Sequence, residues 1–204
     1  MNRPGKIVGV GRNYREHAKE LGNDVPSEPL IFLKPPSTVI GEGAAIVMPA
    51  VSSQVEFEGE IGIVIGRTLR HASEDEATAG IRGVVAVNDV TARDLQKRDD
   101  QWTRAKGFDT FCPLGPLHVL PDDLSAITVV TRVNGVERQR GTAAMMVFQI
   151  PTLLRYISSI MTLEPGDLVA TGTPAGVGPL ADGDVVEVEL EGLSRVRNPV
   201  QAER

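Results

Sequence analysis

The sequence predicts an α+β fold dominated by strands. Short apolar or β-branched stretches recur along all 204 residues, whereas the few stretches with helical spacing and capping residues are brief. Gly (21) and Pro (14) both exceed average usage, as expected where many turns connect short strands. The length fits one domain over residues 1–204, which is large enough to bury a sizeable core.

The first part of the chain should form a strand, a helix and a second strand. Residues 6–10 are apolar and strand-like, and Asn13 follows as a candidate helix N-cap. Glu16 lies three residues later, where a capping-box partner would lie, and Gly22 can end the helix. Residues 30–33 are again apolar and predict a second strand.

The middle of the chain contains its most informative stretch, residues 54–66, which first alternates between apolar and acidic residues and then becomes apolar. We expect one long strand there, bent at Gly59 or Gly62. Ser73 and Glu76 form a second capping box, which opens a short helix. This part should also contain a buried strand and a further short helix, at residues 84–87 and 91–98.

The last part of the chain should contain a hairpin, one amphipathic helix and several strands. Asn134-Gly135 follows a β-branched stretch and is a strong hairpin signal. Pro151 fits the first position of a helix. One face of that helix is apolar and comprises Leu153, Leu154, Ile157 and Ile160. The strands expected here lie at residues 127–133, 167–170, 185–190 and 196–200.

Composition excludes several classes of function. The formal net charge is −6 and no basic stripe is present, which argues against nucleic acid as a partner. No apolar stretch approaches the length of a membrane span, and the N-terminus lacks the apolar core of a signal peptide. The single cysteine, Cys112, rules out an intrachain disulfide and favours a reducing compartment. We therefore expect a cytoplasmic protein without nucleic-acid or membrane partners.

Three carboxylates form a candidate metal site. Glu58 and Glu60 are two residues apart on one predicted strand and so share a face, and Asp89 follows the strand predicted at 84–87. Taken alone, such a glutamate pair is more often a solvent-facing surface. Buried together, the carboxylates would repel one another unless a cation joined them, and their hard oxygens suit magnesium, manganese or calcium rather than zinc.

Several motifs at coherent spacing extend this reading. They are residues 11–14 with His17, then 32–35, 57–62, 88–96, 102–109, 168–174 and 176–178. Together these segments resemble the fumarylacetoacetate hydrolase family over almost the whole chain. The resemblance implies the layered β-fold with short helices of that family's C-terminal domain, in a short form without the extra N-terminal domain of longer relatives. It also implies a homodimer and a mobile lid within residues 11–35.

The resemblance assigns Mg²⁺ to the three carboxylates, with Mn²⁺ as a possible replacement. A histidine–glutamate pair on the lid would prepare a water, and a lysine would face the bound 2-oxo acid. These catalytic residues would be His17, Glu20 and Lys106. An arginine, a glutamine and a Thr-Gly-Thr-Pro turn would contact the substrate. These substrate-binding residues would be Arg93, Gln96, Thr171 and Thr173. Judged alone, each could instead be an ordinary surface or turn residue.

Three functions remain open from the sequence. The first is magnesium-dependent hydrolysis of a C–C bond in an acylpyruvate or similar 1,3-dioxo acid, through a metal-stabilised pyruvate enolate. The second is decarboxylation of oxaloacetate, or decarboxylation or isomerisation of a 2-oxo acid in aromatic catabolism, which needs the same electron sink but no attacking water. The third is non-catalytic binding of an oxo acid or a divalent cation.

Overall fold

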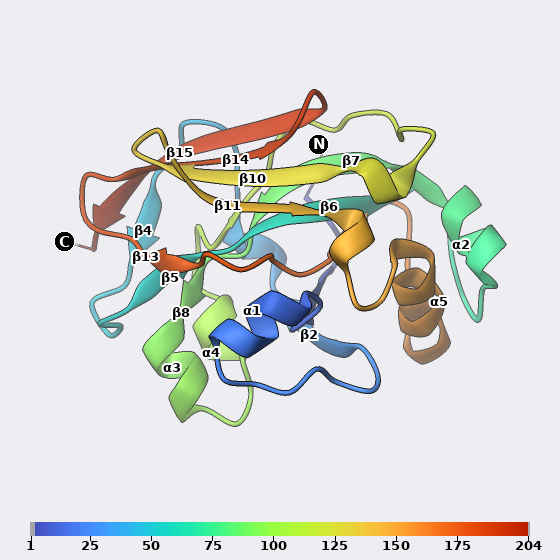
Figure 1. Cartoon of the computed structure of the whole chain (residues 1–204), viewed down its shortest axis with the longest axis horizontal. Coiled ribbons are helices and arrows are strands. Elements are labelled where there is room, and N and C mark those ends of the chain that lie inside the picture. The colour runs from blue at the N-terminus through green and yellow to red at the C-terminus, as the bar shows by residue number, and fades with distance from the viewer. Residues whose placement is uncertain (1–2, 204) are drawn as a thin grey trace.

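Two five-stranded sheets packed face to face form the framework of the computed structural model, which describes residues 3–203 (Figure 1). The first sheet has the order β2-β1-β12-β6-β7. Its strands are β1 (Ile7–Gly11), β2 (Leu30–Lys34), β6 (Gly59–Ile65), β7 (Ile81–Asn88) and β12 (Leu168–Ala170). The second sheet has the order β11-β10-β14-β15-β4. Its strands are β4 (Ile46–Met48), β10 (Thr128–Val133), β11 (Val136–Thr142), β14 (Val185–Leu190) and β15 (Ser194–Ala202).

Strand β6 of the first sheet is buried on both faces, which explains the continuous apolar run of residues 61–65. Ile61 and Ile63 point into the main core cluster, which they share with Val129 and Val188 of the second sheet. Val64 points the other way, into a smaller cluster on the opposite face. A strand covered on both sides needs apolar residues at every position rather than at alternate ones.

Two smaller sheets and five α-helices complete the fold among the described residues. A three-stranded sheet contains β5 (Val55–Phe57), β8 (Thr91–Ala92) and β13 (Gly178–Pro179), and a two-stranded one pairs β3 (Val39–Ile40) with β9 (Cys112–Pro113). The helices are α1 (Arg15–Glu20), α2 (Glu74–Ala79), α3 (Arg93–Arg98), α4 (Thr103–Lys106) and α5 (Ile150–Ile160). Helices α2 and α5 pack together at one end, while α1, α3 and α4 gather on one side of the sheets (Figure 1). The strand-dominated α+β prediction is confirmed.

The strand expected over residues 54–66 is broken at Glu58, so one long bent strand was the wrong prediction. β5 belongs to the three-stranded sheet and β6 to the first sheet. Gly59 permits the close approach of β10 at this break, because a Cβ there would lie 1.9 Å from Thr131 Oγ1. The chain therefore changes sheets at the residue that the sequence offered as a metal ligand.

Two other local predictions were right. Ser73 and Glu76 form the expected capping box at the start of α2, with both reciprocal hydrogen bonds present. Asn134 and Gly135 form the turn between β10 and β11, with φ values of 52° and 79°. Both residues adopt the left-handed conformation that a two-residue hairpin turn demands.

Two details of the helices differ from expectation. Asn13 does not cap α1, whose N-cap is Tyr14 without a side-chain bond. The Asn13 amide instead donates to the Thr171 carbonyl oxygen at 2.8 Å, a long-range contact that local spacing does not reveal. Ile160 is 54% exposed because it lies at the last position of α5, beyond the packed turns. Within residues 3–203, no helix has the length and hydropathy needed to cross a membrane.

Candidate active site

The break in the strand and the end of β7 bring three carboxylates together. Gly59 pairs with Asn88 between β6 and β7, so Asp89 lies beside Glu58 and its N–H donates to the Glu58 carbonyl oxygen at 2.8 Å. One carboxylate oxygen from each of three residues lies within 4.8 Å of the others. We call this set, Glu58, Glu60 and Asp89, the acidic triad; all three residues are buried.

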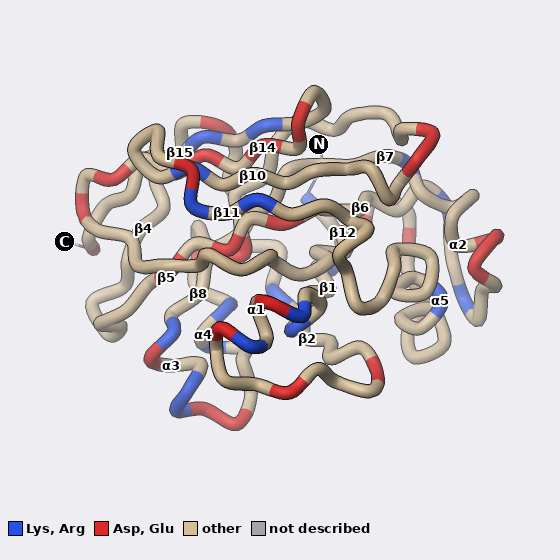
Figure 2. Tube along the Cα trace, in the orientation of Figure 1, with Lys and Arg blue, Asp and Glu red and all other residues tan. Residues whose placement is uncertain are grey.

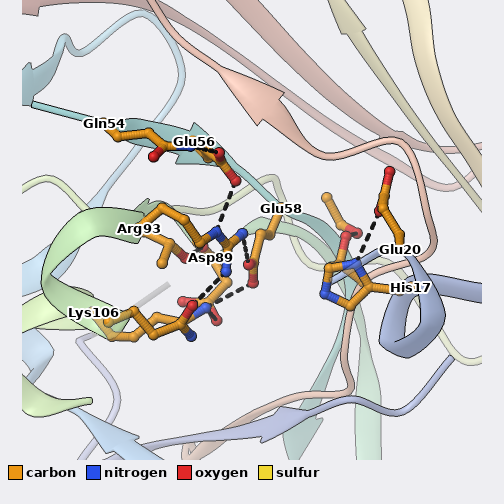
Figure 3. A network of polar contacts seen from close by, with 12 residues as sticks. His17, Glu20, Gln54, Glu56, Glu58, Asp89, Arg93 and Lys106 are labelled. Atoms are coloured by element: carbon orange, nitrogen blue, oxygen red, sulfur yellow. Dashed lines mark hydrogen bonds and ion pairs between the residues drawn. The ribbon is translucent and has the colours of Figure 1, made fainter. Parts of the chain in front are cut away.

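Three basic side chains contact the acidic triad, and Figure 3 shows two of them, Arg93 and Lys106, beside Glu58 and Asp89. Lys106 Nζ donates to Glu58 Oε2 at 2.7 Å and to Asp89 Oδ2 at 2.6 Å, and Lys34 Nζ donates to the other Asp89 oxygen at 2.6 Å. Arg93 donates from Nη2 to Glu58, and from Nε to Glu56 at 2.8 Å. These residues, Lys34, Arg93 and Lys106, are the basic cluster. Each of them is at most 2% exposed.

The two glutamates of the acidic triad differ in their electrostatic surroundings. Burial alone would raise the pKa of Glu58, but Lys106 and Arg93 outweigh it and hold that pKa well below its usual range. Burial raises the pKa of Glu60, and the neighbouring Asp89 and Glu58 charges raise it further. Glu60 accepts a hydrogen bond from the Gly172 N–H at 2.8 Å, but no salt bridge to a basic side chain is seen for it among the described residues.

A divalent cation fits this arrangement. Glu60 is a buried carboxylate without a salt bridge to a basic side chain among the described residues, and its two partners in the acidic triad lie close enough to share one ion with it. Three carboxylate oxygens are the donors that Mg²⁺ and Mn²⁺ prefer. Glu58, Glu60 and Asp89 would therefore hold the metal, each through a carboxylate oxygen.

A cavity of about 460 Å³ opens over the acidic triad. Its wall contains most of the residues that the sequence singled out: Glu58, Glu60 and Asp89, with His17, Glu20, Lys106, Arg93, Gln96 and Thr173. Gln96 accepts a hydrogen bond from Arg93 at 2.5 Å and so reaches the basic cluster. Thr171 does not line the cavity, since it is fully buried and its hydroxyl donates to the Ile61 carbonyl oxygen at 2.9 Å.

His17 and Glu20 face the acidic triad from helix α1. His17 Nδ1 lies 3.3 Å from Glu20 Oε2, and the pair lies on the opposite side of Glu58 from Arg93 and Lys106 (Figure 3). Burial lowers the pKa of His17, against the opposing effects of Glu58 and Glu20, so the ring is neutral near pH 7. Glu20 Oε1 also accepts from the Gly176 N–H at 3.0 Å, which fixes the carboxylate behind the ring.

Sequence reasoning assigned no role to several residues of the site. Lys34 lies inside a matched motif, and a lysine at the end of an apolar strand was the only signal that could have marked it. Phe32 and Trp102 form an aromatic wall, with ring centroids 5.4 Å apart, and Lys106 Nζ lies 5.1 Å from the Phe32 centroid. Arg12 and Lys97 add positive charge to the same wall. Helices α1 and α3 each carry both acidic and basic residues (Figure 2).

Residues 6–201 match the family described as fumarylacetoacetate (FAA) hydrolase C-terminal. The mitochondrial oxaloacetate decarboxylase of Dictyostelium discoideum is 45% identical over 197 residues, which cover 92% of this chain and 89% of that protein. The motif resemblance found in the sequence is therefore confirmed over nearly its whole length.

Solved structures agree with the fold. A 5-carboxymethyl-2-hydroxymuconate delta-isomerase from Mycobacterium smegmatis superposes with a TM-score of 0.92 at 45% identity, covering 99% of this chain and 80% of that one. A fumarylpyruvate hydrolase from Pseudomonas aeruginosa, in complex with Mn²⁺ and pyruvate, gives a TM-score of 0.92 at 30% identity and covers 98% and 91%. The layered β-fold expected from the resemblance is thus confirmed.

Proposed function

Because the chain belongs to the fumarylacetoacetate hydrolase family, we propose that it is a magnesium-dependent hydrolase that cleaves a C–C bond in an acylpyruvate or similar 1,3-dioxo acid. The observation that carries this proposal is the position of the His17–Glu20 pair, which lines the same cavity as the acidic triad. A decarboxylase needs no base to activate water, whereas a hydrolase does. A solved relative whose name is fumarylpyruvate hydrolase supports the same reaction class.

His17 would act as the general base. In the neutral tautomer whose Nδ1–H donates to Glu20, Nε2 is unprotonated and able to accept a proton from water. The water oxygen adds to the distal carbonyl carbon, and the C–C bond to the pyruvate methylene then breaks. That methylene takes up a proton, so an acylpyruvate and one water yield a carboxylic acid and pyruvate.

Positive charge beside the acidic triad would stabilise the departing pyruvate carbanion. A bound Mg²⁺ or Mn²⁺ would polarise the keto oxygen of the 2-oxo acid and accept the negative charge that develops there. The Lys106 ammonium, buried beside the acidic triad, adds charge at the same place. Arg93 and Gln96 line the adjoining wall and would contact the substrate.

Decarboxylation of oxaloacetate is the second candidate, because a relative at 45% identity is named an oxaloacetate decarboxylase. The two reactions share the electron sink and differ in the need for His17. Metal-stripped protein should be assayed with acetylpyruvate and with oxaloacetate separately, each with and without Mg²⁺ or Mn²⁺. Metal-dependent release of pyruvate from acetylpyruvate supports the hydrolase. Turnover of oxaloacetate alone would favour the decarboxylase over the hydrolase. Absence of turnover with both substrates would contradict the proposal.

Three further expectations stay predictions. They are a homodimeric assembly, a cytoplasmic location, and motion of residues 11–35 as a lid. Helix α1 carries His17 and Glu20 and lines the cavity, so closure of such a lid would bring the base to the substrate. The expected domain over residues 1–204 likewise stays a prediction.

A further inference from the structure

The strand break at Glu58 leaves backbone groups that no neighbouring strand can satisfy. Side chains take the place of the missing strand partners. The Asn88 amide oxygen accepts from the Glu58 N–H at 3.0 Å, and the Thr173 hydroxyl donates to the Gly59 carbonyl oxygen at 2.9 Å. The remaining donor, the Gly59 N–H, is bound by Gln139 at 3.0 Å. Buried backbone groups need such partners, because leaving one unpaired is costly.

Gln139 reaches this position from the second sheet. It lies on β11, and the pairing of β10 with β11 shifts by one residue next to it, at a β-bulge between Thr131 and Arg132. Gln139 is 1% exposed although Arg138 and Arg140 on either side point to solvent. A bulge of this kind redirects a side chain, and here the Gln139 amide reaches the Gly59 N–H, between the two glutamates of the acidic triad.

The Gln139 amide uses both of its ends. Its oxygen accepts from the Gly59 N–H, and its nitrogen donates to Thr173 Oγ1 at 2.7 Å and to the Pro174 carbonyl oxygen at 2.8 Å. A backbone N–H must donate and a carbonyl must accept, so only one orientation of the amide fits. The Thr173 hydroxyl oxygen therefore accepts a hydrogen bond from the Gln139 amide nitrogen, and the hydroxyl itself donates to the Gly59 carbonyl oxygen.

Gly59 separates the two glutamates of the acidic triad, so Gln139 acts on both. The Gly59 N–H that Gln139 binds belongs to the peptide bond between Glu58 and Gly59. The turn that it holds at Thr173 also supplies the Gly172 N–H, which donates to the Glu60 carboxylate. One buried amide therefore connects the backbone of the first glutamate with the hydrogen-bond donor of the second.

We propose that Gln139 is a positioning residue, which sets the spacing of Glu58 and Glu60 for a divalent cation by tying the Gly59 peptide to the turn at Thr173. This inference rests on the metal site of the proposed function. It deepens that function by naming a residue outside the cavity wall on which the affinity for metal depends. Partners that orient metal ligands typically change metal affinity by tenfold or more when removed.

The test measures Mn²⁺ binding directly, from the electron paramagnetic resonance signal of the free ion during titration. Gln139→Met keeps the length of the side chain and removes all three hydrogen bonds. Its dissociation constant for Mn²⁺ should rise about tenfold over that of the parent protein. Gln139→Asn keeps the amide but is one methylene too short to reach Gly59 and the turn together, so it should also bind Mn²⁺ more weakly.

Asn198→Leu is the matched control. Asn198 is also a buried amide of the second sheet, 1% exposed, and donates to the carbonyl oxygens of Gly41 and Ala44, both at 2.8 Å. It does not line the cavity. Its loss should lower the melting temperature and leave the Mn²⁺ dissociation constant unchanged within about twofold.

The outcomes separate this inference from the proposed function. Weaker Mn²⁺ binding in both Gln139 variants, with the control unchanged, supports a positioning role. A Gln139→Met protein that loses thermal stability but keeps the parent affinity shows that the residue is only structural, and overturns the inference while the metal site stands. If Gln139→Met does not fold, Gln139→Asn decides in the same way. A parent protein that binds no Mn²⁺ overturns both the inference and the metal site.

Discussion

Lys34 and Asp89 form an ion pair in which Nζ and Oδ1 lie 2.6 Å apart and neither side chain is more than 1% exposed. Asp89 shares its other oxygen with Lys106, so two ammonium groups hold one carboxylate. The pair joins β2 of the predicted lid region to the end of β7. Removing one partner of a buried ion pair leaves the other charge without compensation, so the loss of Lys34 should destabilise the protein.

Replacement of Lys34 by Met should lower the free energy of unfolding of the metal-free protein by about 3 kcal/mol, because Asp89 keeps only one of its two cations. Urea denaturation would measure the change. Arg104→Met is the control, since it removes a basic group from the exposed pair with Asp99 and should have little effect. Equal losses of unfolding free energy in the two variants would show that burial of the Lys34–Asp89 pair does not increase its contribution to stability.

Replacement of His17 by Ala should reduce kcat for acetylpyruvate hydrolysis by about a hundredfold or more, because a positioned general base contributes that much. Mn²⁺ affinity should stay the same, since His17 donates no hydrogen bond to the acidic triad. His118→Ala, a histidine outside the cavity wall, serves as the control. Undiminished hydrolysis by the His17→Ala protein would show that His17 is not the general base.

The pH profile should report the titration of His17. Its pKa lies below the ordinary value of 6.5, chiefly because of burial, so activity should hold at neutral pH and fall only in more acidic solution, where the ring is protonated. Glu20 raises this pKa through its hydrogen bond and its charge. Glu20→Gln should therefore move the acidic limb of kcat/KM to lower pH. An acidic limb that moves to higher pH, or does not move, would contradict the pairing.

Replacement of Gly59 by Ala should destabilise the protein by about 1–3 kcal/mol, the usual range for overpacking. The added methyl group would lie 1.9 Å from Thr131 Oγ1, so β6 and β10 would have to separate. Gly41→Ala is a suitable control because no atom lies within 4 Å of its would-be Cβ. Comparison of the two urea midpoints tests the prediction. Similar midpoints would contradict it and show that β10 can move enough to accommodate the methyl group.

The acidic triad was accessible to sequence reasoning because its signals are local. Glu58 and Glu60 are two residues apart, which is the period of a strand, and Asp89 closely follows the apolar stretch predicted as a buried strand at residues 84–87. The capping box of Ser73 and the hairpin turn at Asn134 were predictable for the same reason. In the capping box and the hairpin turn, the residues that make the structure are neighbours in the sequence.

The break at Glu58 and the role of Gln139 were not accessible, because their causes lie far away in the chain. Gly59 approaches Thr131 and binds Gln139, which follow it by more than seventy positions. Asn13 shows the same limit, since its local spacing fitted a helix cap while a carbonyl 158 residues away bound its amide. Packing between distant segments decided these positions, and no local pattern encodes it.

The pairing of the acidic triad with the basic cluster has a consequence for the order of ligand addition. Three carboxylates face three basic groups, and Arg93 is shared with Glu56, so the ensemble carries no net positive charge without a cation. A 2-oxo acid anion gains little there by electrostatics, whereas a bound divalent ion makes the pocket attractive to it. We therefore expect obligatory sequential loading, with the metal first. Calorimetric titration of pyruvate should show binding only to protein already saturated with Mn²⁺, and equal binding without metal would contradict this order.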